Sequence, residues 1–242
     1  MGLFGKKKSS FIVNGTEKIL HKNLNFTATE QYKLLRTNLD FVLPAGEKCP
    51  IVGVTSPTRG EGKSTTSINL AYVLAEKGSK VLLIDGDLRL PSIAKKLEIE
   101  NKTGLIGLLM GEPIQTENLK SPLHDNWYVL TSGEIPPNPS ELLGSERMER
   151  TLNELRKRFD YIVIDLPPVN VVSDAVSVSR LITGMLVVTK EDYTERKELE
   201  LCVRQLELAN VKILGCVMTC AKLRGGRYRS KGKYDDRSGE NA

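Results

Sequence analysis

One stretch of this 242-residue chain has glycines, a lysine and a serine at the spacing of a phosphate-binding loop. The segment SPTRGEGKSTT ends in Gly62-Lys63-Ser64, which matches the end of the G-x-x-x-x-G-K-[ST] pattern, and Pro57 stands where the first glycine is expected. In such a loop the lysine reaches the β- and γ-phosphate oxygens, and the serine hydroxyl binds Mg²⁺. A Gly-rich turn between a strand and a helix, with no ligand, is the competing interpretation.

The backbone of the loop is expected to bind phosphate as well. Gly60 and Gly62 have no side chains, so the chain can pass close to the β-phosphate. A helix that starts near Lys63 would present free N–H groups and its positive dipole end to the same phosphates. The residues that we expect to contact the nucleotide are Thr58, Arg59, Gly60, Glu61, Gly62, Lys63, Ser64 and Thr65.

Three carboxylates follow apolar runs elsewhere in the chain. KVLLIDGDLR contains Asp85 and Asp87, and YIVIDLPP contains Asp165. An aspartate at a strand end is usually a turn former, but ligands bind at the carboxyl edge of a parallel sheet, where all three would meet the loop. We expect Ser64, Asp87 and Asp165 to hold Mg²⁺, directly or through its waters. Asp85 is then free to accept a proton from a substrate hydroxyl, and Lys63, Asp85 and Asp87 form the catalytic set.

The strands and helices that must position these residues alternate along the chain. Continuous apolar runs without polar alternation are typical of strands buried on both faces of a parallel sheet. Helical patterns lie between them, so the sequence predicts an α/β fold with a doubly wound, mainly parallel sheet. The expected strands are 51–55, 80–85, 127–131, 161–165, 184–189 and 211–219; the expected helices are 63–77, 92–97, 104–110, 140–158 and 194–209.

A further helix is expected near the start of the chain. Thr27-Ala-Thr-Glu30 resembles a helix cap with an acidic residue in the first turn. The positions that we expect this helix to bury are Leu34, Leu35, Leu39 and Val42.

Length and composition are those of one folded domain with polar ends. Hydrophobic residues make up 40% of the chain, which is enough for a core, and no apolar run approaches the ~18 residues of a membrane-spanning helix. We therefore expect a cytoplasmic protein with a flexible segment 1–26, a folded domain 27–221 and a disordered basic tail 222–242.

The four cysteines make no CxxC pair, and reduced core thiols are the favoured interpretation. Cys216 and Cys220, in CVMTC, could be metal ligands, but no second His or Cys pair completes such a site.

The net charge of +5 belongs to the two ends of the chain. Residues 221–242 contain seven Lys or Arg against three acidic residues, and residues 1–10 add three lysines. Basic ends suit an anionic membrane surface or an acidic partner, and solvated tails that only aid solubility are the alternative. Nucleic acid is not expected as a partner, because no RNA-binding motif or recognition helix accompanies the charge.

Four motifs, in this order, resemble those of a known family. SPTRGEGKSTTSINLA, VLLIDGDLRLP, TSGEIPPNPSELL and YIVIDLPPV resemble the bacterial tyrosine kinases of capsule and exopolysaccharide synthesis, in the form with a separate cytoplasmic kinase chain. The resemblance runs from about residue 30 to residue 219. It places the chain among the P-loop NTPases with a deviant Walker A motif, together with cell-division and plasmid-partition ATPases.

The resemblance implies ATP and Mg²⁺ as cofactors, with Asp85 and Asp87 in the Walker A′ motif and Asp165 as the Walker B acid. It implies that Tyr228 and Tyr234, in the basic tail, are phosphorylated by a neighbouring subunit. It also implies a homo-oligomer, with a ring as one form, a cognate tyrosine phosphatase, and a membrane-spanning activator that recruits the kinase to the inner face of the membrane.

Four positions depart from related sequences. Lys33 stands between Glu30 and Arg36 where the family has arginine in an E-x-x-R-x-x-R pattern, and lysine lacks the bidentate geometry that ring packing would use. Thr219 replaces an asparagine that contacts adenine, and Leu166 replaces a threonine beside the Walker B acid.

The fourth departure bears on the alternative function, an ATPase switch or scaffold of the partition type. Thr58 occupies the position of the signature lysine of those ATPases. The kinase family also lacks that lysine, so Thr58 disfavours the alternative without proving the kinase function.

Overall fold

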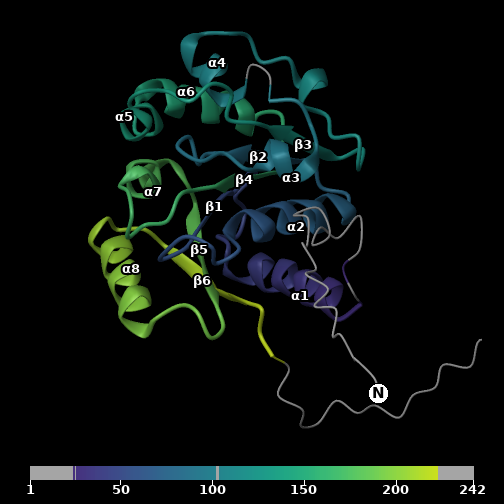
Figure 1. Cartoon of the computed structure of the whole chain (residues 1–242). Helices are drawn as coiled ribbons and strands as arrows, with labels where there is room; N and C mark the ends of the chain where they lie inside the picture. Colours follow the sequence, from purple (N-terminus) through teal and green to yellow (C-terminus); the bar gives the residue numbers. More distant parts are fainter. Residues whose placement is uncertain (1–23, 25, 102–103, 223–242) are drawn as a thin grey trace, which may run out of the picture.

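Six parallel strands form one sheet at the centre of the molecule, as the apolar runs predict. The computed structural model describes residues 24, 26–101 and 104–222 (Figure 1). The strand order is β3-β2-β4-β1-β5-β6. The strands are β1 (Ile51–Thr55), β2 (Val81–Asp85), β3 (Trp127–Leu130), β4 (Tyr161–Asp165), β5 (Gly184–Lys190) and β6 (Ile213–Thr219).

Helices cover both faces of the sheet, so the predicted doubly wound α/β fold is confirmed (Figure 1). Successive strand residues point to opposite faces, and along β2 the side chains enter the two cores alternately. One face packs against α1 (Phe26–Val42), α2 (Lys63–Glu76) and α3 (Ile93–Leu97). The other packs against α4 (Gly104–Met110), α5 (Pro139–Leu143), α6 (Glu146–Arg156), α7 (Asp174–Ser177) and α8 (Arg196–Leu208).

The single helix predicted over residues 140–158 is wrong, because the chain forms two helices there. α5 ends before Gly144, and Ser145 starts α6 as its N-cap residue, with its Oγ atom accepting a hydrogen bond from Met148 N at 3.2 Å. Serine competes for backbone N–H groups through its hydroxyl, which favours a new helix start over continuation. Three short segments were not predicted: α7 and the 3₁₀ turns η2 (Thr116–Leu119) and η3 (Ser179–Leu181).

The first helix is present, but fewer of its side chains are buried than predicted. It begins at Phe26, so Thr27 lies inside it and does not cap it. Leu39 is buried and Leu35 packs at the edge of the core, whereas Leu34 and Val42 are exposed. α1 packs on α2 outside the sheet, and only a narrow stripe of an outer helix meets the core.

The prediction of core thiols is confirmed for two cysteines and wrong for the other two. Cys49 and Cys202 are buried, but Cys216 and Cys220 are exposed. Cys216 lies on β6, which is an edge strand with one face partly open to solvent, and Cys220 follows the end of that strand.

No helix within the described residues is long and apolar enough to cross a membrane. Apart from Lys222, the predicted tail lies outside the described residues, with both of its tyrosines, Tyr228 and Tyr234, and so does almost all of the predicted segment 1–26.

Candidate active site

The phosphate loop and the three carboxylates meet at the carboxyl edge of the sheet. β1 leads into the loop and α2 begins at Lys63, as predicted. β2 and β4 are neighbours, and Asp85 and Asp165 are direct partners in their register. Gly60 and Gly62 have φ values of 81° and 97°, which residues with a side chain rarely adopt. These positive angles turn the loop so that it ends in the free N–H groups at the start of α2.

A buried glutamate holds the loop from inside. Glu61 is fully buried. Its carboxylate accepts a hydrogen bond from the backbone N–H of Thr58 at 2.9 Å and one from the hydroxyl of Thr194 at 2.5 Å. Both oxygens of Glu61 are therefore used to shape the loop, and this residue reaches a nucleotide only through its backbone. No motif pointed to Thr194, which lies 133 positions from Glu61 in the chain.

Thr219 also supports the loop. Its hydroxyl lies 2.7 Å from the carbonyl oxygen of Glu61, to which it donates, and 3.1 Å from that of Thr189. A side chain added at Gly62 would meet the Thr219 methyl group at 3.2 Å. The hydroxyl at this departure from the family pattern is thus committed to the backbone beside the loop.

Lys63 forms an ion pair with Asp87. Its Nζ atom lies 2.8 Å from Asp87 Oδ2, and both side chains are largely shielded from solvent. Burial by itself lowers the pKa of Lys63, but the charges of Asp165, Asp87 and Asp85 outweigh burial, so the net pKa shift is upward. The other oxygen of Asp87 accepts a hydrogen bond from the backbone N–H of Leu90 at 3.1 Å.

Asp85 is buried with one oxygen free. Its Oδ2 atom accepts hydrogen bonds from the backbone N–H groups of Ser92 and Ile93, both at 2.9 Å, at the start of α3. Its Oδ1 atom is buried and has no partner. Burial and the nearby charge of Asp165 raise the pKa of Asp85 to about 7, although the two N–H groups oppose the shift. A carboxyl with such a pKa can take up and release a proton near neutral pH.

Asp165 is also fully buried with one free oxygen. Its Oδ1 atom accepts a hydrogen bond from the Ser67 hydroxyl at 3.1 Å, and its Oδ2 atom has no partner. Burial raises its pKa, while the charge of Lys63 and hydrogen bonds from Ser64 and Ser67 act in the opposite direction. Ser67 was not predicted, although it follows Lys63 by one helical turn on the same face of α2.

The donor set fits a magnesium ion bound together with phosphate. Asp165 Oδ2, a buried carboxylate oxygen without a partner, lies at the end of β4 near Ser64, and Asp87 follows the neighbouring strand β2. Mg²⁺ keeps several waters and usually takes only one or two carboxylates from the protein. In the part of the chain that the structure describes, no cluster of three or more His, Cys, Asp or Glu side chains could hold a metal alone. Phosphate oxygens and waters would therefore complete the coordination.

The loop that carries Asp87 is fixed by a second ion pair. Arg89 donates two hydrogen bonds to Asp174, from Nε at 2.9 Å and from Nη2 at 3.0 Å. Asp174 is fully buried at the start of α7 and also accepts a hydrogen bond from the Ser140 hydroxyl at 2.5 Å. This arrangement ties the segment after β2 to α5 and α7. No motif in the sequence pointed to Asp174.

The remaining predicted residues are placed as follows. Arg59 is exposed at the tip of the loop, and Thr65 is half-buried in the first turn of α2. On α1, Lys33 pairs with Glu30 at 3.0 Å, and Arg36 donates to the carbonyl oxygen of Val73 at 2.7 Å.

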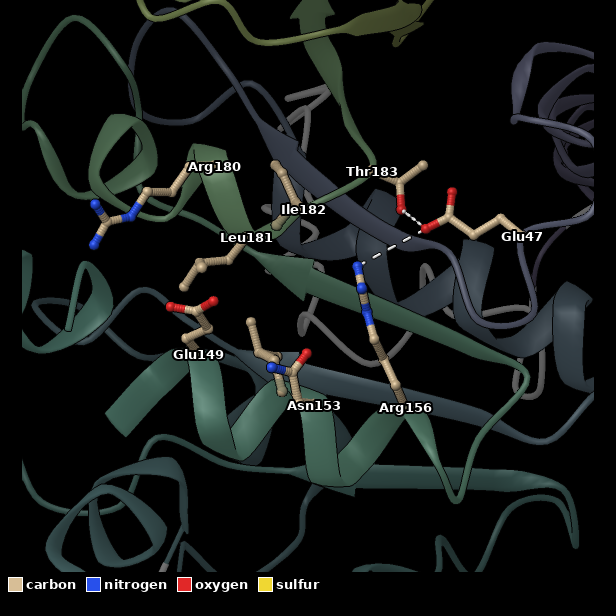
Figure 2. Close-up of a pocket in the computed structure, with 9 residues that line it drawn as sticks. Glu47, Glu149, Asn153, Arg156, Arg180, Leu181, Ile182 and Thr183 are labelled. Atoms are coloured by element: carbon tan, nitrogen blue, oxygen red, sulfur yellow. Dashed lines mark hydrogen bonds and ion pairs between the residues drawn. The ribbon is translucent and has the colours of Figure 1, made fainter. Parts of the chain in front are cut away.

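A separate cavity of about 160 Å³ lies at the opposite edge of the sheet (Figure 2). It sits between α6 and the segment before β5, where Arg156 points toward Glu47 and an arginine nitrogen lies 3.8 Å from a glutamate oxygen. The Thr183 hydroxyl donates to the same glutamate at 2.8 Å. Because this cavity faces the amino ends of β1 and β5, it is distinct from the site formed by the loop and the carboxylates.

Comparison with known proteins agrees with this site. Residues 51–194 match the AAA domain family. The chain is 37% identical over 202 residues to tyrosine-protein kinase YwqD of Bacillus subtilis, covering 84% of each chain. It is 35% identical over 216 residues to tyrosine-protein kinase CpsD of Streptococcus pneumoniae, covering 88% of this chain and 94% of that one.

Solved structures show the same fold. The kinase domain of the Escherichia coli tyrosine kinase ETK superposes with a TM-score of 0.75 at 33% identity, over 85% of this chain and 80% of that one. The septum site-determining protein MinD of Pyrococcus horikoshii, in complex with Mg-ADP, superposes with a TM-score of 0.57 over 70% of each chain. At 24% identity, that second likeness shows the fold of the P-loop ATPases alone. The chain belongs to the family of bacterial tyrosine-protein kinases.

Proposed function

We propose that this chain is a Mg²⁺-ATP-dependent protein-tyrosine kinase that phosphorylates Tyr228 and Tyr234 in the tail of a second copy. Membership of the family supports the kinase activity. The observation that carries the proposed chemistry is Asp85, a buried carboxylate with a free oxygen and a pKa of about 7 beside the phosphate loop. A tyrosine phenol is protonated at neutral pH, so its attack on ATP is helped by a base at this position.

The loop and Lys63 would hold the triphosphate. The N–H groups at the start of α2 and its dipole favour the negative phosphates. Lys63 is within 2.8 Å of Asp87 and has only to exchange this carboxylate for the γ-phosphate. Arg59, exposed at the tip of the loop, is placed for an additional phosphate or subunit contact.

Ser64, Asp87 and Asp165 would hold Mg²⁺, directly or through its waters. When bound, the ion neutralises charge that develops on the phosphate oxygens during transfer. Asp165 has a free oxygen for this role, whereas Asp87 would gain one when Lys63 moves to the phosphate.

The transfer itself needs one bond made and one bond broken. The phenol oxygen of the incoming tyrosine attacks the γ-phosphorus, the bond from that phosphorus to the bridging oxygen of ADP breaks, and ADP leaves. The phenol proton passes to Asp85. Positioning and charge neutralisation supply most of the rate in this class of reaction.

We further propose that the kinase regulates capsule or exopolysaccharide synthesis and export together with a membrane-spanning activator. The similarity to CpsD supports this pathway. Recruitment to the inner face of the membrane by the activator, assembly into a homo-oligomer and reversal by a cognate tyrosine phosphatase belong to the same proposal.

The test uses the full chain with Mg²⁺-ATP and the cytoplasmic segment of the membrane protein encoded beside its gene. Phosphate is located by mass spectrometry. The proposal expects modification of Tyr228 and Tyr234, and loss of it in Lys63→Met. ATP hydrolysis without any modified tyrosine would instead support the alternative, an ATPase switch or scaffold, for which the MinD-like fold is the favouring observation.

A further inference from the structure

A tyrosine outside the tail contacts the phosphate loop directly. The turn between β5 and α8 carries Tyr193, whose hydroxyl donates a hydrogen bond to the carbonyl oxygen of Arg59 at 3.0 Å. The hydroxyl also lies 3.3 Å from the position that a Cβ atom at Gly60 would occupy. Tyr193 is therefore packed against the outer side of the loop that is proposed to bind ATP.

The same turn is coupled to the inside of the loop. Thr194, the next residue, donates to the buried Glu61 at 2.5 Å, and Lys190 lies over the Tyr193 ring at 4.7 Å from its centre. A change at Tyr193 is thus transmitted to both surfaces of the loop.

Tyr193 differs from the other described tyrosines in its accessibility. It is 52% exposed, whereas the other described tyrosines are half-buried. Among the described residues, the Tyr193 hydroxyl makes a single hydrogen bond, the one to the carbonyl oxygen of Arg59. Rotation about the side-chain bonds of Tyr193 therefore frees its phenol group. The other described tyrosines are Tyr32, Tyr72, Tyr128 and Tyr161.

The start of the tail is anchored on this turn. Lys222 forms an ion pair with Asp192 at 2.6 Å, and its backbone N–H donates to Glu191. The described part of the chain ends at Lys222, next to the turn that carries Tyr193.

We propose that Tyr193 is a further phosphorylation site of this kinase and that its phosphorylation switches off nucleotide binding in the modified copy. The inference rests on the proposed function. The Tyr193 phenol oxygen attacks the γ-phosphorus of ATP in a second copy, ADP leaves, and the phenol proton passes to Asp85 of the copy that holds ATP.

Two physical effects turn the modification into an off-switch. The esterified oxygen no longer has a hydrogen to donate to Arg59, so the contact between turn and loop is lost. The phosphate adds about −1.5 to −2 charges at the outer side of the loop, where it repels the phosphates of ATP and attracts Lys190. Both effects weaken the binding of nucleotide.

The first experiment maps phosphate on the full chain after incubation with Mg²⁺-ATP and the activator segment. In a Tyr228→Phe/Tyr234→Phe variant, the remaining phosphate should map to Tyr193 and disappear when Tyr193→Phe is added. Tyr161, whose hydroxyl donates to Asp40 at 3.1 Å, serves as an internal control that stays unmodified.

The outcomes separate the two proposals. A phosphorylated tail with unmodified Tyr193 overturns the inference and leaves the proposed function standing. Phosphate on Tyr193 alone supports the inference and contradicts the assignment of the tail as acceptor. The absence of any phosphotyrosine would contradict both the proposed function and the inference.

The second experiment measures the switch without any kinase activity. Tyr193→Glu and Tyr193→Gln differ only in charge, and we expect the glutamate variant to bind a fluorescent ATP analogue roughly tenfold more weakly at low salt. The difference should shrink in high salt, and circular dichroism checks that both variants fold. Equal affinities at low salt overturn the off-switch.

Discussion

Lys63 and Asp87 are paired inside the site, with 2.8 Å between the ammonium nitrogen and a carboxylate oxygen. Their side chains are 14% and 7% exposed, so water screens this attraction weakly. The lysine that we assign to the γ-phosphate is thus already held by a carboxylate. ATP must take the lysine from Asp87, and Asp87 becomes free for the metal when it does.

This competition predicts that Asp87→Asn changes the affinity for ATP in opposite directions without and with Mg²⁺. Without Mg²⁺, the variant should bind an ATP analogue roughly fivefold more tightly than the wild type, because Lys63 has lost its charged competitor. With Mg²⁺, it should bind more weakly, because one of the proposed metal ligands is gone. Fluorescence titration in EDTA and in Mg²⁺ measures both values.

Asp40→Asn is the matched control for that titration. Asp40 pairs with Lys77 at 2.6 Å on the outer side of α1 and α2, away from the loop. Its loss should change neither affinity. If Asp87→Asn weakened binding in EDTA as well, the carboxylate would be supporting the loop and not competing for its lysine.

A second prediction concerns the proposed base. Asp85→Asn should lower the rate of phosphotransfer by about 10²- to 10⁴-fold while changing the affinity for ATP much less. Asparagine retains an oxygen that can accept from Ser92 and Ile93, so the start of α3 stays in place. Single-turnover rates and equilibrium binding of the same samples test this. An equal loss of both quantities would remove the role of Asp85 as a base.

A third prediction follows from the pKa of Asp85, which burial raises from its usual value near 4 to about 7. Between these pH values the folded protein keeps a proton that the unfolded chain releases, so this group lowers the free energy of unfolding as the pH rises toward 7. Asp85→Asn cannot ionise. It should match the wild type only below about pH 4, where Asp85 is protonated in both the folded and the unfolded chain, and be more stable at pH 8, by a few kcal/mol at most, since each pKa unit is worth about 1.4 kcal/mol. Urea unfolding at the two pH values measures this, and an unchanged difference between them would contradict the pKa shift.

The parts of the site that the sequence predicted are those set by local pattern. Buried parallel strands appear as continuous apolar runs, and Asp85 and Asp165 stand at the ends of two of them. Because the carboxyl ends of parallel strands share one edge, their convergence required no knowledge of the strand order. The loop glycines needed positive φ values, which restrict the choice of residue.

The parts that the sequence did not predict depend on contacts between distant segments. Thr194 meets Glu61 across 133 positions, and Asp174 meets Arg89 across 85. Nothing local distinguishes such a threonine or aspartate from one at the surface. The break between α5 and α6 was missed for a different reason, since the apolar spacing of residues 140–158 also suits one long helix, and the capping serine decided the outcome.

A fourth prediction tests the buried support of the loop. Glu61→Gln removes the charge and one of the two oxygen acceptors, so either the bond from the N–H of Thr58 is lost, or the hydroxyl of Thr194 must accept from the amide and its own proton loses its acceptor. We expect faster hydrogen exchange in residues 56–62 and ATP binding weakened by about 1 to 3 kcal/mol. Thr194→Ser keeps the hydroxyl and should behave as wild type. Normal exchange and affinity in Glu61→Gln would show that the loop holds its shape without these bonds.

The last prediction concerns the ion pair that anchors the segment bearing Asp87. Arg89→Met leaves the fully buried carboxylate of Asp174 without its cation, whereas Asp174→Asn removes the buried charge and keeps a hydrogen-bond acceptor for Arg89. The arginine variant should therefore lose more stability, by about 1 to 3 kcal/mol relative to the asparagine variant. Adding Asp174→Asn to Arg89→Met should recover part of that loss, because the uncompensated charge is gone. Unfolding of the two single variants and the double variant completes the cycle. Suppose that the two single variants lose equal free energy of unfolding and that the double variant loses their sum. The exposed arginine would then contribute nothing to holding Asp174, and the segment after β2 would be fixed by its backbone alone.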